Sequence, residues 1–187
     1  MTNFFRLSFA RFATLFSATL LAIFLIPAQV AKAEFTYVDS AGAWLFYTQR
    51  GVGANYAACQ VVSCVRGVCT SGPNPRTQFS LYDARDGRGI SPEFIAPRRV
   101  EPGGTARLRI GTETFRLRNT FPSPQYYMFI ENTADIRKVL RGLVELERRD
   151  DNAKFHVIDA GGTEHEFTVR GLTTSLNRMQ RRCDPKG

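Results

Sequence analysis

The sequence predicts a mainly β fold, an antiparallel sandwich or half-barrel with two short helices, and three observations support this. Short runs rich in β-branched and aromatic residues recur between turns, with prolines such as Pro92 and Pro97 expected in the loops. Only two segments change to the period of a helix. Finally, 43% hydrophobic and 22% charged residues in a chain of 187 fit one compact domain and exclude a collagen or a coiled coil.

Residues 1–33 have the three-part layout of a secretory signal peptide. Their apolar run, Phe12–Ile26, is shorter than the roughly 20 residues that a membrane-spanning helix needs. Small residues stand three and one positions before the bond between Ala33 and Glu34, where we expect cleavage. The mature chain, 34–187, is therefore predicted to be one β-rich domain, periplasmic or secreted, with no transmembrane span.

The mature chain is predicted to be only mildly basic. Three of the 25 Lys and Arg residues precede the expected cleavage site, which leaves 22 against 17 Asp and Glu residues, a formal charge of +5. Export of the protein disfavours nucleic acid as a partner. We therefore expect an anionic glycan or lipid headgroup, and the family resemblance given below adds an envelope or host protein.

The first part of the mature chain consists of runs that are predicted as strands. They are Phe35–Val38, Trp44–Thr48, Tyr56–Cys64, Val68–Thr70, Gln78–Tyr82, Glu93–Ala96, Ala106–Ile110, Thr114–Arg118 and Tyr126–Ile130. The seventh and eighth runs form a hairpin in which apolar residues take one face. Arginines take the other face: Arg107, Arg109, Arg116 and Arg118. Because guanidinium groups match oxyanions with two parallel hydrogen bonds, these four residues are the candidate anion-binding site.

A first helix is predicted at residues 133–141. Asn132 offers an N-cap, and Gly142 is placed to end the helix. Apolar residues recur between them at helical spacing: Ile136, Val139, Leu140 and Leu143. A strand at Leu143–Glu147 is expected to follow.

A second helix is predicted at about Thr173–Arg182. One apolar stripe follows its 3.6-residue period and ends in a cysteine: Leu172, Leu176, Met179 and Cys183. The stripe predicts that Cys183 faces the core.

Two strands between these helices, Lys154–Ile158 and Glu164–Arg170, are predicted to form a hairpin. A loop of three residues places Phe155 opposite Phe167 and Val157 opposite His165, which keeps the apolar residues on one face. His156 and His165 then lie on opposite faces of the sheet. The two histidines of the chain are therefore not expected to form a metal-binding or acid–base pair.

All four cysteines lie after the expected cleavage site, and an even number in an exported protein predicts two disulfides. We expect Cys64–Cys69, across a tight turn, and Cys59–Cys183, which joins the core face of a strand to the second helix. The rival pairing is Cys59–Cys64 with Cys69–Cys183. No metal site is predicted, because the spacing lacks the C-x2-C element of zinc sites.

No stretch carries the residue types and spacing of a known reaction, so neither a catalytic residue nor a cofactor is predicted. The acids Glu145/Glu147 and Glu164/Glu166 alternate at strand spacing and are explained by solvated sheet faces. A deep cleft that held Glu145 or Glu147 with a raised pKa would favour an enzyme.

The leading hypothesis is a non-enzymatic binding module of the bacterial envelope. The alternatives are an envelope-remodelling hydrolase, and a structural or stress-tolerance envelope protein without a discrete ligand.

The end of the chain, from Gly161 to Cys183, resembles the closing strand, glycine and helix of the invasion-associated locus B family of exported alphaproteobacterial proteins. The resemblance is carried mainly by the residues Phe167–Leu176, with support from Gly42-Ala43-Trp44 and from the short helix at Ile136–Leu140. The cysteine spacing departs from the family pattern. The resemblance implies a non-enzymatic, β-rich envelope or secreted domain that is linked in some members to host-cell interaction.

Overall fold

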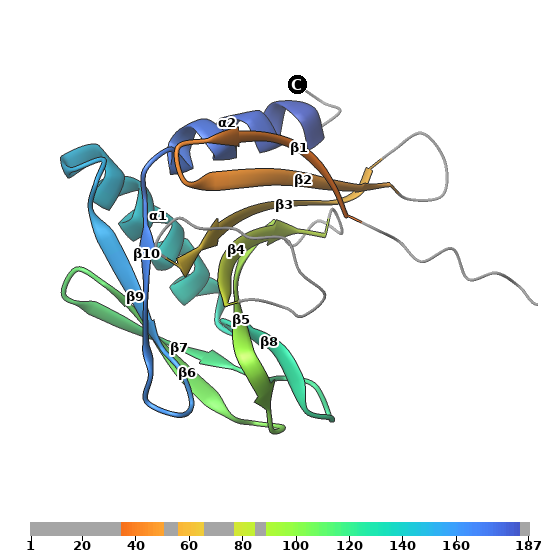
Figure 1. Cartoon of the computed structure of the whole chain (residues 1–187), viewed down its shortest axis with the longest axis vertical. Helices are drawn as coiled ribbons and strands as arrows, with labels where there is room; N and C mark the ends of the chain where they lie inside the picture. Colours follow the sequence, from red (N-terminus) through yellow and green to blue (C-terminus); the bar gives the residue numbers. More distant parts are fainter. Residues whose placement is uncertain (1–34, 51–55, 66–76, 85–88, 184–187) are drawn as a thin grey trace, which may run out of the picture. The chain divides into compact units, whose positions relative to one another are not determined.

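The computed structural model describes residues 35–50, 56–65, 77–84 and 89–183. The strands in these ranges are β1 (Phe35–Ala41), β2 (Trp44–Arg50), β3 (Tyr56–Cys64), β4 (Gln78–Asp83), β5 (Ile90–Val100), β6 (Thr105–Ile110), β7 (Glu113–Arg118), β8 (Gln125–Phe129), β9 (Lys154–Ile158) and β10 (Glu164–Thr168). They form one antiparallel sheet in the order β1-β2-β3-β4-β5-β8-β7-β6-β9-β10, together with helices α1 (Thr133–Arg149) and α2 (Leu172–Cys183) (Figure 1). The predicted mainly β, antiparallel fold class with two helices is confirmed.

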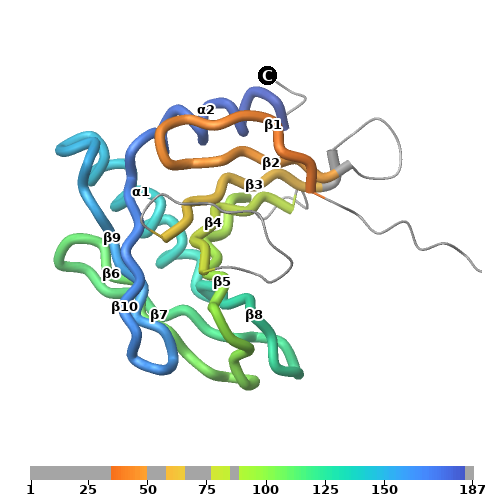
Figure 2. The backbone as a smooth tube through the Cα atoms, in the orientation of Figure 1, coloured from red at the N-terminus to blue at the C-terminus, as the bar shows by residue number. Residues whose placement is uncertain are grey.

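The sheet is open, but it curves enough for β2 and β4 to share one core with β9. The ring of Phe79 on β4 lies 4.9 Å from that of Phe155 on β9, centroid to centroid, and Trp44 on β2 stacks on Phe155 at 6.4 Å. Trp44 Nε1 also donates a hydrogen bond to the Thr168 carbonyl at 3.1 Å. Figure 2 shows the backbone curvature of the sheet. Burying each large apolar side chain contributes about 1.5–3 kcal/mol, so this aromatic cluster stabilises that curvature. Of the two predicted arrangements, a single curved sheet corresponds to the half-barrel.

Two glycines bring the β1–β2 turn against the link between β10 and α2. Gly42 and Gly171 both have positive φ, at 57° and 89°. A Cβ atom on Gly171 would overlap the Ala41 carbonyl, and one on Gly42 would overlap the Arg170 carbonyl. The Ala43 amide donates to that same Arg170 carbonyl at 2.9 Å. Backbone therefore packs on backbone here, which only residues without a side chain allow.

The prediction for the first helix was wrong about where it ends. Asn132 does cap α1, accepting a hydrogen bond from the Ala134 amide at 2.8 Å, but the helix continues through Gly142 to Arg149. The segment predicted as the strand Leu143–Glu147 is therefore helical. The apolar spacing continues past the glycine, and Leu143 is fully buried. The helix continues because burial of residues on both sides of Gly142, Val139 and Leu143, stabilises it against the sheet.

The sixth predicted strand was too short, because β5 contains two prolines that were assigned to loops. Pro92 pairs with Leu81 of β4 before pairing with β8 begins at Glu93. Pro97 lies in an irregularity between Ile95 and Val100, where β5 and β8 are not in register. Pairing with β8 is absent at both prolines, so the N–H that proline lacks is not needed there for a bond to that strand. The predicted strand Val68–Thr70 lies outside the described residues.

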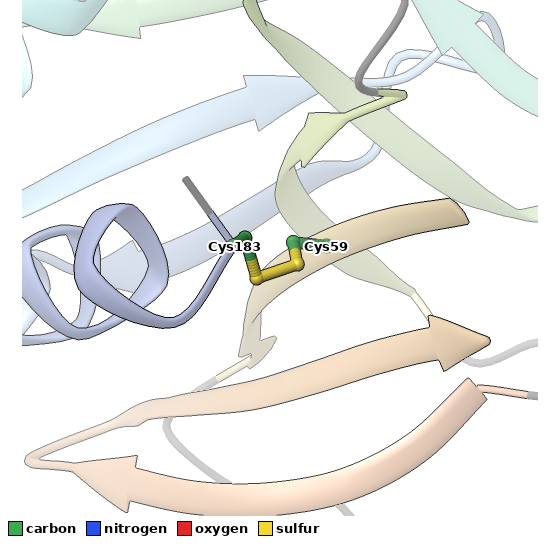
Figure 3. Close-up of a disulfide and its surroundings, with 2 residues drawn as sticks. All are labelled: Cys59 and Cys183. Carbon is green, nitrogen blue, oxygen red and sulfur yellow. A yellow bond between two sulfur atoms is a disulfide. The ribbon is translucent and has the colours of Figure 1, made fainter. Parts of the chain in front are cut away.

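The two helices pack on the inner side of the curved sheet. Helix α1 contacts β5 and β6, whereas α2 lies along β1, β2 and β3 (Figure 1). Leu172, Met179 and Cys183 are buried, so the predicted stripe of α2 is confirmed. Figure 3 shows the disulfide between Cys183 and Cys59 of β3, with Cα atoms 6.4 Å apart.

Candidate functional site

The candidate anion-binding residues lie together on the outer face of the β6–β7 hairpin. We call this surface the arginine face: Arg107, Arg109, Arg116 and Arg118. All four are exposed, while the residues between them along both strands are buried in the core. The predicted alternation along the hairpin is therefore observed.

Two of the four arginines are paired with acids from neighbouring elements. Arg109 donates to Glu164 of β10 at 2.5 Å, and Arg118 lies 3.6 Å from Glu131. These pairs are exposed, so each contributes at most about 1 kcal/mol to stability. Their charges are nevertheless partly balanced. The acids at 131 and 164 thus reduce the pull of this half of the arginine face on an anion.

The other two arginines oppose each other directly. Arg107 and Arg116 are cross-strand partners, and Arg107 faces the uncharged Ile158 on the β9 side. Neither arginine forms an ion pair with an acid anywhere in the described ranges. Like charges directly opposite in a sheet are unfavourable by a few tenths of a kcal/mol or more. The pair therefore places two arginines opposite each other with no acid from the described residues to balance them.

The two histidines lie on opposite faces, as the hairpin register predicted. Val157 pairs with His165 and Phe155 with Phe167. His165 Nε2 lies 2.9 Å from a carboxylate oxygen of Asp159, on the inner side of the sheet. His156 is on the outer face, where its Nδ1 lies 2.9 Å from Glu164 Oε1. Each histidine thus has its own acid.

Asp159 holds the loop between β9 and β10 as well as His165. Its second oxygen accepts hydrogen bonds from the amides of Gly161 and Thr163, both at 2.9 Å. Burial opposes ionisation of Asp159, but the bonds from His165 and from these two amides outweigh it and lower the pKa of the carboxyl. Asp159 therefore stays ionised and fixes the orientation of the imidazole. The sequence analysis did not single out this pair.

The paired acids of the predicted strand Leu143–Glu147 lie on α1 instead. Glu145 is exposed and bonds Arg148 and Arg149, and these hydrogen bonds lower its pKa to about 2. Glu147 accepts hydrogen bonds from the amides of Gly171 and Thr173 at 2.8 Å, which caps the start of α2. The pKa of Glu145 is thus shifted downward, which is opposite to the raised pKa that would favour an enzyme.

The second pair of acids does lie on an exposed sheet face, as predicted. Glu164 and Glu166 share the outer face of β10. Glu166 accepts a hydrogen bond from Lys154 at 2.7 Å, and Glu164 is held by Arg109. Both acids therefore balance basic neighbours.

A buried acid was missed by the sequence analysis. Glu93 on β5 is only 6% exposed and accepts hydrogen bonds from Ser80 at 2.7 Å and Gln60 at 3.2 Å. Burial raises its pKa, and these two bonds offset the rise only in part. The pKa of the nearby Tyr127 is also raised, first by burial of Tyr127 itself and second by the charge of Glu93. The sequence signal for the burial of Glu93 was the apolar run that follows it, because a strand buried on both faces has a nearly continuous run of apolar residues.

The disulfide prediction is confirmed for Cys59–Cys183, which excludes the rival pairing of Cys59 with Cys64. No described cysteine has a free thiol. The predicted partner of Cys64, Cys69, lies outside the described residues. So do the predicted signal peptide and the expected cleavage site between Ala33 and Glu34.

Two features are absent from the part of the chain that the structure describes. No group of three or more potential ligand residues there could hold a metal ion. Neither of the two helices is long and apolar enough to cross a membrane. Comparison of the chain with protein-family models, with curated proteins and with solved structures finds no match.

Proposed function

We propose that the protein is a non-enzymatic binding module of the bacterial envelope, periplasmic or secreted, that holds an anionic glycan or lipid headgroup on its arginine face. One observation carries the proposal: Arg107 and Arg116 oppose each other on an exposed sheet face without a described acid to balance them. A bound oxyanion would turn an unfavourable like-charge contact into two charge-assisted hydrogen-bond sites.

Three features support the proposed periplasmic or secreted location. The layout of residues 1–33 supports export, and a disulfide such as Cys59–Cys183 is stable in an oxidising compartment. The resemblance of the closing strand, glycine and helix to the invasion-associated locus B family supports the same location and a role in interaction with a host cell.

The arginine pair predicts how binding depends on the residues and on salt. In the exported protein, Arg107→Glu/Arg116→Glu should weaken binding to vesicles that contain an anionic phospholipid, or to polygalacturonate, by about tenfold or more. Added salt should weaken binding by the wild type, because exposed charges are screened over about 8 Å at physiological ionic strength. Vesicle co-sedimentation and calorimetric titration measure the two arms and show which source of anion is preferred.

A matched control separates a site from general basicity. Arg137→Glu/Arg141→Glu makes the same change in net charge on exposed positions of α1, and it should leave binding nearly unchanged. Equal losses from the two double variants would contradict the proposal, as would binding that does not respond to salt.

A further inference from the structure

We propose that a cavity at one end of the curved sheet is a second binding site, which takes a small organic acid with one carboxylate. The cavity measures about 650 Å³ and lies between the last residues of β5 and the loop that joins β9 to β10. These segments lie at the same end of the sheet (Figure 2). Small-molecule sites typically occupy about 300–1,000 Å³, so the size of this cavity fits such a site.

The basic wall of the cavity comes from the irregularity in β5. Residues 96–99 stand opposite Tyr126 alone, because Ile95 pairs with Tyr127 and Val100 with Gln125. Such bulges redirect side chains and are frequent beside binding sites. Here the extra residues include Arg98 and Arg99, which line the cavity.

Neighbouring contacts hold this wall in place. The Arg99 guanidinium lies 5.7 Å from the centre of the Tyr126 ring, within the range of a cation–π interaction. At the end of the bulge, the buried Asn119 donates a hydrogen bond to the Val100 carbonyl at 2.7 Å. The bulged segment is therefore anchored at two points.

The opposite wall presents His165, the residue that Asp159 orients. Both side chains are largely buried, with 11% and 13% exposed. The ring lies against Phe94, with centroids 5.7 Å apart, and its Nε2 is occupied by Asp159. An imidazole held in one orientation by Asp159 thus lines the cavity.

The lining determines which ligand fits best. Arg98 and Arg99 attract an anion, whereas two acids in the lining, Glu101 and the ionised Asp159, oppose a second negative charge on the ligand. This balance favours a single carboxylate over a doubly charged phosphate. Ala96 and Val100 add apolar surface for the rest of the molecule. A carboxylic acid with a small apolar body meets all these conditions.

NMR titration of the exported, isotope-labelled protein with sodium benzoate tests this site. Benzoate should shift the amide signals of the loop, Gly161 and Thr163, together with Gly104 at the rim, while neutral benzamide should not. Arg98→Gln/Arg99→Gln should weaken benzoate binding by about tenfold or more, because it removes charged hydrogen-bond donors. Both arginines are exposed, so the variant should keep the remaining wild-type spectrum.

The control and the contrary outcomes are specific to this cavity. Arg107→Gln/Arg116→Gln, on the arginine face, should leave benzoate binding unchanged, so the two sites can fail independently. Equal shifts with benzamide, or an unchanged affinity in the Arg98/Arg99 variant, would overturn the proposal. Tighter binding of phenyl phosphate than of benzoate would overturn the assignment to a monocarboxylate.

Discussion

Glu93 shows how a single buried residue can work against folding. Its side chain has hydrogen-bond donors in Ser80 and Gln60, but its pKa is still raised because burial disfavours the charged form. For an acid with a raised folded-state pKa, the stabilising contribution is complete below the ordinary value of 4.5 and is lost as pH rises through the folded-state pKa. At neutral pH, well above the ordinary pKa of 4.5, burial of this carboxyl is therefore a cost to the fold.

Replacement of this carboxyl by an amide should stabilise the protein only above acidic pH. Glu93→Gln keeps an oxygen for both donors, so its free energy of unfolding should match the wild type near pH 4 and exceed it at pH 7. Each unit of pKa shift corresponds to about 1.4 kcal/mol. Urea unfolding across this range measures the difference, with Glu113→Gln as the control for loss of one exposed charge. A Glu93→Gln variant that is less stable at pH 7 would show that the charged form is favourable.

At the scale of elements, two connections matter as much as the strands they join. The β1–β2 turn meets the link between β10 and α2 through Gly42 and Gly171, and Glu147 of α1 bonds the same link. The end of α1, the start of α2 and the first hairpin are thus held at one point. The two stretches that carry the family resemblance, Gly42–Trp44 and Phe167–Leu176, contact each other here.

Gly171→Ala should destabilise the protein more than an alanine at another glycine of positive φ. Positive φ alone costs alanine about 1–2 kcal/mol, but at Gly171 the added Cβ also meets the Ala41 carbonyl, so the backbone must shift. Gly111→Ala is the matched control, because Gly111 has a φ of 56° and open space around it. Thermal unfolding ranks the two variants. Equal losses would mean that the close approach of the two connections contributes nothing.

At the scale of the whole molecule, the disulfide joins the third strand to the last residue of the last helix. Cys59 and Cys183 are separated by 124 residues in sequence, so the bond closes most of the span from 35 to 183 into one loop. In the chain-entropy model, a loop of this length gives about 5 kcal/mol as an upper figure. The bond also ties α2 to β3, across the core that the curved sheet encloses (Figure 3).

Removal of this long-range bond should cost more than removal of the short one. Cys59→Ser/Cys183→Ser should lower the free energy of unfolding by about 2–5 kcal/mol. Cys64→Ser/Cys69→Ser should cost less, because the predicted Cys64–Cys69 bond closes only a short loop. Denaturant midpoints of the exported variants give the order. The reverse order would contradict the loop-length argument.

The sequence by itself determined the features that repeat with a local period. Period-two alternation predicted the two faces of β6 and β7, and the apolar pairing predicted the register of Phe155 with Phe167. A helical stripe placed Cys183 on the core side of α2. These features depend on neighbouring residues in the chain, so a single sequence contains them.

Only the tertiary structure decided the features that depend on elements distant in sequence. Burial of Val139 and Leu143 against the sheet carried α1 past Gly142, a residue type that often ends a helix. The strand order β6-β9-β10 brought Glu164 to Arg109 and left Arg107 and Arg116 without an acid from the described chain. The physical reason is that charge pairing and close packing depend on distances in space, and a local period in sequence does not specify them.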